Sequence, residues 1–301
     1  MADSPQQKSI TIKDAIIQLE AIRSSTIISF ITDGNALIGP EDAPVIAGTI
    51  EMVAGHGGKL PRLDLFLHSH GGFLDPAYKI VKVCREYAQE FNVIVPYLAK
   101  SAATVICLGA NEIVMTSLSE LGPIDPIVQH PYKPDIRVPA RSIKDFFQFL
   151  NSTETESQIT VDQNMKNQMA ALLDPYLIGS YQTAMQSAKQ IAEMLLQETS
   201  LKDNPTKLKD TVKKLTEYYY SHSFVIDKQA ALAMGLNIKS AEDTPPLKDS
   251  IWQLFLIYQN FMRANNVVKL VGNREINRHA QAAQQQPGIN KPQQTNLASY
   301  E

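Results

Sequence analysis

Short apolar runs alternate with helix-like segments between Ile10 and Met115. Apolar residues at helical spacing mark segments 10–23, 41–54, 75–91 and 102–108 as helices. Runs rich in β-branched and other apolar residues mark 26–34, 63–68, 92–98 and 112–115 as strands. Because strands that are separated by helices pair in parallel through right-handed crossovers, we expect an α/β fold with helices on both faces of the sheet.

The pattern becomes mainly helical after Pro126. Helical spacing marks 142–150, 163–197, 207–220 and 247–270 as helices, and a short helix runs between Asp227 and Gly235. Pro175 falls inside the 163–197 pattern and should kink or divide that helix. The 247–270 helix is apolar around much of its circumference, so it must pack on this domain or on another subunit.

These patterns divide the chain into four segments. They are an N-terminal helix (1–24), a main α/β domain (25–240), an apolar C-terminal helix (241–272) and a polar tail (273–301). The tail consists largely of Gln, Asn, Ala and Pro and has little to bury, so we expect it to be disordered.

Composition places the sequence among globular proteins without a basic nucleic-acid-binding surface. The 301 residues are 44% hydrophobic, which is enough for a substantial core, and the net charge of −3 provides no basic field. Cys84 and Cys107 lie in apolar helix-like stretches, which favours core packing over a disulfide or a metal site. Neither a secretory signal nor an apolar run of membrane-spanning length is visible, so we expect a cytoplasmic protein.

A glycine pair and a serine follow two neighbouring strands of the expected sheet. Gly71 and Gly72 come shortly after the 63–68 strand, and Ser101 comes after the 92–98 strand. Loops at the C-terminal ends of parallel strands are where α/β folds place ligands and chemistry. The glycine N–H groups could bind a developing oxyanion, and Ser101 could supply a nucleophile at a helix N-terminus. The pattern therefore favours an acyl-transferring hydrolase.

Each of these residues also has a purely structural interpretation. Ser101 is suited to capping the helix that follows it. Gly71 and Gly72 are suited to a tight strand-to-helix turn that needs positive φ. The presence of the glycine pair and the serine on neighbouring crossovers is what favours catalysis.

Three blocks of the sequence carry a family resemblance. The blocks HSHGGFLDPAYKI, YLAKSAATVICLGANEIVMTSLSELGPIDP and HSFVIDKQAALAMGLNI resemble the serine dehydrogenase proteinase family, which is related to the Clp protease proteolytic subunit and to signal peptide peptidase A. This resemblance implies a ClpP/crotonase-like fold of β-β-α units in a peptidase domain that oligomerises, followed by a helical C-terminal region. It also implies that Ser101 is the nucleophile and that Gly71, Gly72 and Ala102 supply oxyanion amides.

The resemblance leaves the general base open. In Clp-type relatives a histidine follows the next strand, where this sequence has Asp125, and in signal-peptide-peptidase relatives a downstream lysine serves, for which Lys144 is the nearest candidate. His222 matches a histidine segment of the serine dehydrogenase proteinase family. A Ser101–His222–Asp125 set is chemically sensible, because imidazole titrates near neutral pH and a carboxylate can fix its tautomer. A lysine base would need burial to lower its pKa. We therefore expect the base to be His222, with Lys144 as the alternative.

Two histidines, His68 and His70, flank Ser69 just before the glycine pair. Strand alternation places both imidazoles on one face of the sheet. Two ligands are too few for a closed zinc site and no Cys/His cluster completes one, so we expect no metal. We assign His70 to the substrate cleft.

The sequence thus predicts a serine peptidase that cuts peptide or protein substrates through an acyl-enzyme on Ser101, as a homo-oligomer and without a cofactor. Two other classes stay open. A crotonase-type enzyme uses the same oxyanion amides to stabilise an acyl-CoA enolate, although Ser101 would then be idle. A scaffold that kept the fold and lost its base is consistent with Asp125 at the usual histidine position.

Overall fold

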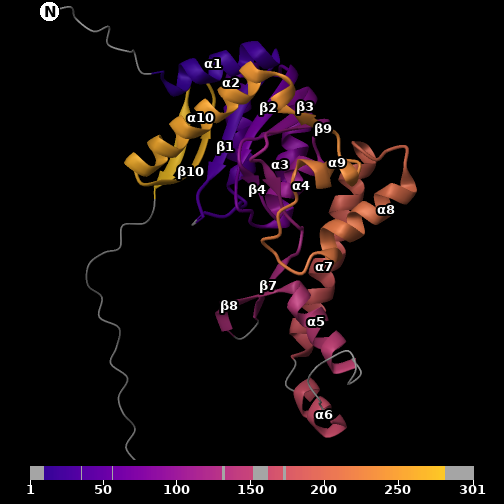
Figure 1. Cartoon of the computed structure of the whole chain (residues 1–301). Coiled ribbons are helices and arrows are strands. Elements are labelled where there is room, and N and C mark those ends of the chain that lie inside the picture. Colours follow the sequence, from indigo (N-terminus) through magenta and orange to yellow (C-terminus); the bar gives the residue numbers. More distant parts are fainter. Residues whose placement is uncertain are drawn as a thin grey trace, which may run out of the picture.

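The computed structural model describes residues 10–34, 36–55, 57–130, 133–151, 162–171 and 174–281. Within these residues, a central sheet of seven strands has the order β11-β10-β1-β2-β3-β5-β9 (Figure 1). The strands are β1 (Thr26–Thr32), β2 (Leu60–His68), β3 (Ala88–Val95), β5 (Glu112–Met115), β9 (Ile238–Ser240), β10 (Val267–Gly272) and β11 (Asn277–Gln281). The five strands from β1 to β9 in this order pair in parallel, whereas β10 and β11 pair antiparallel.

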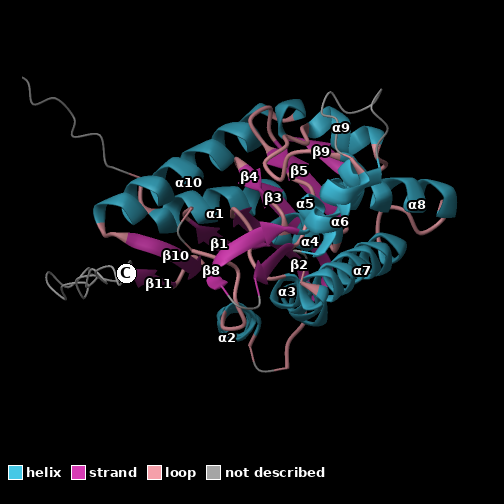
Figure 2. Cartoon of the chain, turned by 90° about the horizontal axis from the view of Figure 1, so that it is seen from below, coloured by secondary structure: helices cyan, strands magenta, loops and turns pink. Residues whose placement is uncertain are grey.

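Helices cover both faces of the sheet, as the sequence predicts (Figure 2). One face is covered by α1 (Ile12–Arg23) and α10 (Pro245–Ala264). The other is covered by α2 (Asp42–Ala54), α3 (Leu74–Tyr87), α4 (Ala102–Leu108) and α7 (Pro175–Glu198). Strand residues alternate between the two cores: Leu65 and Leu67 of β2 pack with the second group of helices, and Phe66 packs with the first.

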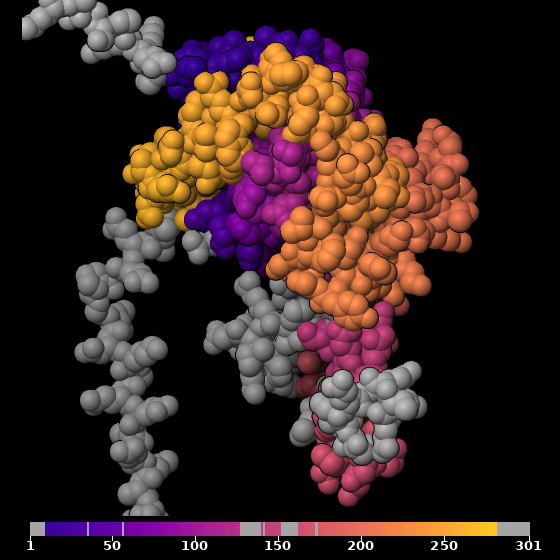
Figure 3. Space-filling view, viewed as in Figure 1, coloured from indigo at the N-terminus to yellow at the C-terminus, as the bar shows by residue number. Residues whose placement is uncertain are grey.

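A helical projection extends away from the sheet (Figures 1 and 3). It contains α5 (Ala140–Asn151), α6 (Gln163–Ala171) and the first turns of α7, and it follows the hairpin of β7 (Ile127–His130) and β8 (Lys133–Pro139). α5 and α7 share a small core of Ala140, Ile143, Leu177 and Met185. Pro175 is the first residue of α7 and Asp174 caps it, so the long helical pattern is divided at the proline as predicted.

Short elements surround the C-terminal end of the sheet. β4 (Leu98–Ala99) pairs in parallel with β6 (Glu120–Leu121). α8 (Pro205–Lys213) continues into the π-helical turn η1 (Lys214–Tyr218), and α9 (Lys228–Ala233) and the 3-10 turn η2 (Ala241–Asp243) flank β9. The side chain of Asp227 accepts a hydrogen bond from Ala230 N–H (2.8 Å), which confirms the predicted cap of α9.

The C-terminal region contains strands as well as the expected helix. α10 ends at Ala264, and Asn266 turns the chain with a φ of 52°. β10 then pairs with β1, and β11 pairs with β10. The predicted 247–270 helix is therefore too long, because the β-branched residues from Val267 onward form a strand on the edge that β1 offers.

Two of the central strands also begin earlier than the sequence predicts. β2 begins at Leu60 and β3 at Ala88, because these two residues are already paired with each other. The helix before β3 accordingly ends at Tyr87 instead of continuing to Phe91. The division of the chain into four segments stays a prediction, and residues 1–9 and 282–301 lie outside the described residues.

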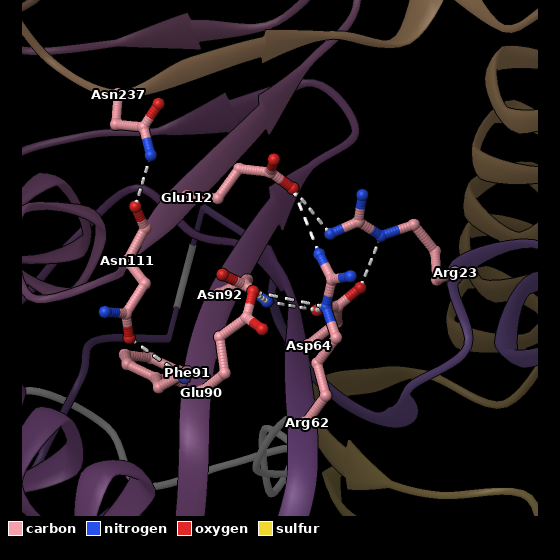
Figure 4. Close-up of polar contacts among 9 residues, drawn as sticks. All are labelled: Arg23, Arg62, Asp64, Glu90, Phe91, Asn92, Asn111, Glu112 and Asn237. Atoms are coloured by element: carbon pink, nitrogen blue, oxygen red, sulfur yellow. Dashed lines mark hydrogen bonds and ion pairs between the residues drawn. The ribbon is translucent and has the colours of Figure 1, made fainter.

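Charged side chains cross-link the central strands near their N-terminal ends (Figure 4). Arg23 of α1 donates hydrogen bonds to Asp64 (2.6 Å) and Glu112 (2.8 Å), and the side chains of Arg23 and Asp64 are both buried. Asp64 also accepts a hydrogen bond from Asn92 (2.9 Å), and Arg62 donates to Glu112 (3.3 Å). This network lies toward the opposite end of the strands from the loops that carry the candidate catalytic residues.

Candidate active site

The glycine pair and the serine lie side by side at the C-terminal end of the sheet. A Cβ built on Gly71 would lie 2.9 Å from Ser101 Cβ and 3.2 Å from Ala102 N. Lys100 N–H donates a hydrogen bond to Ser69 O (3.0 Å), which joins the two loops through their backbones. The structure therefore brings together the two loops that the sequence analysis singled out.

A cavity of about 700 Å³ opens beside these loops. Its lining includes four of the site residues that the sequence predicts, namely His70, Gly72, Ser101 and His222. Apolar side chains from several elements complete the wall, among them Leu37, Phe73, Pro126 and Ala184. A hydroxyl, an imidazole and an apolar surface thus face one space large enough for part of a peptide.

Ser101 has an unusual backbone conformation in a sharp strand-to-helix turn. Its φ is 53° and its ψ is −117°, a combination that is strained for a residue with a Cβ. Turns of this kind present a nucleophilic hydroxyl at the start of a helix. Ser101 occupies the N-cap position of α4, but its side chain makes no capping hydrogen bond and is 8% exposed. Its Oγ has no hydrogen-bond partner among the described residues, so it is free to meet a ligand.

The N–H group of Gly71 is already engaged. It donates to the Oγ of Ser69 (3.0 Å), and that oxygen also accepts a hydrogen bond from the hydroxyl of Thr32 (2.9 Å). Gly71 has a φ of 106°, and a Cβ there would lie 2.7 Å from Lys100 O. Glycine is required at this position because of both the left-handed φ and the close approach of the serine loop.

The N–H groups of Gly72 and Ala102 remain for a ligand. Neither has a hydrogen-bond partner within the part of the chain that the structure describes. Ala102 is the first residue of α4, where N–H groups have no acceptor within the helix. Gly72 lies against the backbone of Ile38, since a Cβ on Gly72 would lie 2.3 Å from Ile38 N. Gly72 lines the cavity, and Ala102 directly follows Ser101, which also lines it.

His222 and Asp125 form a close but incomplete pair. His222 Nδ1 lies 3.9 Å from Asp125 Oδ2, and the side chains are 27% and 7% exposed. This separation is longer than a hydrogen bond. The Nδ1 atom of His222 and the Oδ1 atom of Asp125 are buried without a hydrogen-bond partner among the described residues. A small rotation that joins the imidazole to the carboxylate would satisfy both groups.

Backbone hydrogen bonds hold the segments that carry this pair. Leu121 N–H donates to Ile226 O (2.9 Å), and Ile226 N–H donates to Leu121 O (3.0 Å). Ile124 N–H donates to Leu215 O (2.8 Å), next to the π-helical turn η1. These hydrogen bonds therefore join the segment that leads to Asp125 to the chain both before and after His222.

Lys144, the alternative base, faces a different part of the molecule. Its Nζ lies 3.0 Å from Glu217 Oε2, and Lys189 contacts the same carboxylate. Hydrogen bonds from Lys189 and Lys144 lower the pKa of Glu217 against the opposing effect of burial. Lys144 lines a second cavity of about 840 Å³ that does not include Ser101 in its lining. The structure thus brings His222, and not Lys144, to the cavity of the serine.

The two histidines before the glycines share one face, as alternation predicts. The ring centroids of His68 and His70 are 6.1 Å apart. His70 is exposed at the cavity, whereas His68 is buried between Tyr97 and Phe255. Burial, with a smaller effect from the charge of His70, lowers the pKa of His68 to about 4. No group of three or more His, Cys, Asp or Glu residues that could hold a metal is found in the described chain.

A family assignment agrees with this arrangement. A model of the ClpP-like SDH-type serine proteinase family matches residues 5–285, nearly the whole chain. The chain belongs to this family. The mostly parallel sheet with helices on both faces is the fold that the sequence resemblance implies. In the described part of this family member, no helix combines the length and the apolar character that crossing a bilayer requires.

Relatives of this SDH-type family member are known by sequence and by structure. Two uncharacterized proteins of Methanocaldococcus jannaschii are similar: MJ0137 is 25% identical over 89% of this chain and 72% of its own length. MJ1495 is 24% identical over 78% of this chain, and the match spans only 61% of the length of MJ1495. Among solved structures, the membrane-bound stomatin-specific protease 1510-N is 15% identical with a TM-score of 0.42, over 71% of this chain and 79% of the other. ClpP1 from Listeria monocytogenes is 12% identical with a TM-score of 0.41, over 70% of this chain and 91% of the other.

Three contributors to the site were missed by the sequence analysis. The hydroxyl of Ser69 accepts a hydrogen bond from Gly71 N–H, Lys100 donates to Phe224 O in the loop of His222, and the π-helical turn η1 precedes that loop. The only local signal for Ser69 was its position two residues before Gly71, in the run HSHGG. A π-helical turn has no simple sequence signature, but such turns often occur near functional sites.

Proposed function

We propose that this chain is a serine peptidase in which Ser101 attacks the carbonyl carbon of a peptide bond. One observation carries the proposal: Ser101 and His222 line the same cavity, together with Gly72. The N–H groups of Gly72 and of Ala102, which follows Ser101, have no hydrogen-bond partner among the described residues. Membership in a serine proteinase family supports the same reaction class. The pairing of His222 with Asp125 supports His222 as the base.

The reaction proceeds through an acyl-enzyme. The Oγ of Ser101 forms a bond to the carbonyl carbon, and His222 takes the hydroxyl proton through Nε2, since its Nδ1 faces Asp125. The carbonyl oxygen becomes an oxyanion that the N–H groups of Gly72 and Ala102 stabilise. His222 passes the proton to the leaving amine as the C–N bond breaks. A water molecule, deprotonated by His222, then hydrolyses the ester on Ser101.

This scheme refines the roles that the sequence analysis assigned. Gly71 shapes the turn but donates no hydrogen bond to the oxyanion, because its N–H is bonded to Ser69. His70 borders the substrate. Lys144 stabilises the helical projection through Glu217 and takes no proton from the serine.

The substrate is a peptide or protein chain. The apolar lining of the cavity, which includes Leu37 and Phe73, suits side chains or backbone of an unfolded segment.

We further propose a homo-oligomer, because several large apolar side chains are exposed, including Tyr176 and Tyr220. Light scattering of the purified chain tests this state. The cytoplasmic location stays a prediction from the sequence.

Covalent labelling by a fluorophosphonate tests the assignment of Ser101. We expect the wild-type chain to gain the mass of one probe, and Ser101→Ala to gain none. Ser187→Ala is the matched control, because Ser187 lines the same cavity and should leave labelling intact. Labelling of Ser101→Ala at the wild-type rate would refute the nucleophile assignment.

Labelling also separates the peptidase from the two alternative classes, and a ligand titration separates those two from each other. A scaffold without a functional base would fold and assemble but would not label. A crotonase-type enzyme would also resist the probe, and it would bind an acyl-CoA thioester in a calorimetric titration. Substitution of Gly72 by Ala would then weaken that binding, since the oxyanion donor and the packing against Ile38 would both be disturbed.

A further inference from the structure

The Lys100 ammonium uses all of its donors within the protein. Its Nζ lies 2.6 Å from Glu120 Oε2, 3.1 Å from Leu121 O and 3.2 Å from Phe224 O. A lysine ammonium has three N–H donors and no acceptor, so these contacts satisfy it fully. Its side chain is only 12% exposed. Although Lys100 precedes the nucleophile in sequence, its ammonium is bound by this set of acceptors, and Lys100 is not among the residues that line the cavity.

The acceptors belong to the two segments that carry the imidazole–carboxylate pair. Phe224 lies in the same loop as His222, and Leu121 leads into the segment of Asp125. Lys100 itself is covalently joined to Ser101. One partly buried cation therefore connects the three segments that carry the nucleophile, the base and the carboxylate.

The surrounding residues are arranged to admit this side chain. A Cβ on Gly122 would lie 2.8 Å from Lys100 Cδ, so a larger residue there would obstruct the lysine. The hydroxyl oxygen of Thr104 lies 2.8 Å from Ala99 O and 2.9 Å from Gly122 O and accepts a hydrogen bond from Gly122 N–H (3.1 Å), which fixes the spacing between α4 and the chain after β6. The absence of a side chain at Gly122 and the hydrogen bonds of Thr104 therefore accommodate the Lys100 side chain between α4 and the chain after β6.

We propose that Lys100 is a positioning residue, which sets the place of His222 relative to Ser101 by tying the His222 loop to β6 and to the nucleophile turn. The kinetic consequence rests on the proposed peptidase function. The tie itself, meaning the hydrogen bonds of Lys100 to Glu120, Leu121 and Phe224, does not depend on that function, because it is a property of the folded chain. A displacement of about 1 Å in a catalytic group can slow a reaction about 100-fold.

The double variant K100M/E120M tests the proposal. It removes the ammonium and its carboxylate together, so that no buried charge is left without a partner and the fold is preserved. We expect the amide hydrogens of the 221–226 segment to exchange at least about tenfold faster than in the wild type, because local opening becomes easier. We also expect labelling of Ser101 by a fluorophosphonate to slow about 100-fold. The pH profile of labelling should lose its imidazole inflection, which a merely structural loss of folded protein would not cause.

The matched control is K82M/E198M, which removes an ion pair of 3.6 Å between two half-exposed side chains away from the cavity. It should change neither exchange in the 221–226 segment nor the labelling rate. Unchanged exchange in K100M/E120M would overturn the proposal whether or not the chain is a peptidase. Faster exchange with a wild-type labelling rate and pH profile would overturn the positioning role. If the wild type never labels but exchange is faster in K100M/E120M, the structural role of Lys100 is supported and the peptidase assignment is refuted.

Discussion

The Nδ1 atom of His222 lies 3.9 Å from Oδ2 of Asp125, just outside hydrogen-bonding distance. Both residues keep a buried polar atom without a hydrogen-bond partner in the described chain, and such atoms cost free energy in the folded state. Substrate binding that turns the imidazole toward the carboxylate would remove this cost. A turn of this kind leaves Nε2 of His222 as the ring nitrogen available in the cavity that Ser101 also lines.

Asp125→Asn should slow fluorophosphonate labelling of Ser101 by about 100-fold or more, because an amide no longer stabilises the imidazolium and can favour the wrong tautomer. Asp75→Asn is the control, since Asp75 is an exposed carboxylate that lines the same cavity. Initial labelling rates measured by intact mass give the comparison. A wild-type rate in Asp125→Asn would remove this carboxylate from the mechanism.

Gly71→Ala should unfold more easily and label slowly. The left-handed φ of 106° and the contacts with Lys100 O and Ser101 Cβ would force the two loops apart, at a cost of about 2 kcal/mol or more in the free energy of unfolding. Gly179→Ala is the matched control, because Gly179 lies in α7 and a Cβ there meets nothing within 4 Å. That control should be neutral or gain up to about 1 kcal/mol from helix propensity. Urea unfolding of the two variants decides between these outcomes, and equal stabilities would contradict the close packing of the loops.

Arg23→Met should lower the free energy of unfolding by about 3 kcal/mol, because it removes the buried guanidinium that donates to Asp64 and leaves that carboxylate only Arg62, at 3.6 Å, as a cationic partner (Figure 4). Lys13→Met is the control, since the Lys13–Glu275 pair is exposed and worth less than about 1 kcal/mol. The residual folded protein of Arg23→Met should label at the wild-type rate, as the network lies far along the strands from Ser101. A stability loss no larger than that of Lys13→Met would show that Asp64 does not depend on Arg23 and that Arg62 compensates for it.

The sheet could be predicted from the sequence because its strands are short apolar runs in which both faces are buried. Leu65, Phe66 and Leu67 pack on alternate faces, which produces a continuous apolar pattern that only a covered parallel strand explains. The C-terminal strand was missed because the predicted helix was continued across the largely polar residues 263–266 into the apolar residues from Val267 onward. Only the free edge of β1, a long-range feature, makes a strand there.

The candidate site could be predicted in part, for the same physical reason. Gly71, Gly72 and Ser101 follow strands that are neighbours in the sheet, so topology alone brings them together. Which glycine keeps a free N–H depends on the hydroxyl of Ser69, whose orientation is a tertiary contact. The choice between His222 and Lys144 depends on how α5 and η1 are placed, and no local pattern encodes that placement.

His68 should make the stability of the chain depend on pH in the range from 6.5 to 4. Burial lowers the pKa of His68 from 6.5 to about 4, so in this range the unfolded state binds a proton that the folded state does not. The free energy of unfolding should therefore be unaffected by this group above pH 6.5, fall as the pH decreases, and be lower by about 3 kcal/mol near pH 4. Urea unfolding at a series of pH values should show a shallower decrease for His68→Gln than for the wild type. His279→Gln, which removes an exposed imidazole on β11, is the control. Parallel curves for the wild type and His68→Gln would mean that the imidazole takes up a proton in the folded state, and that the cluster with Tyr97 and Phe255 opens to admit it.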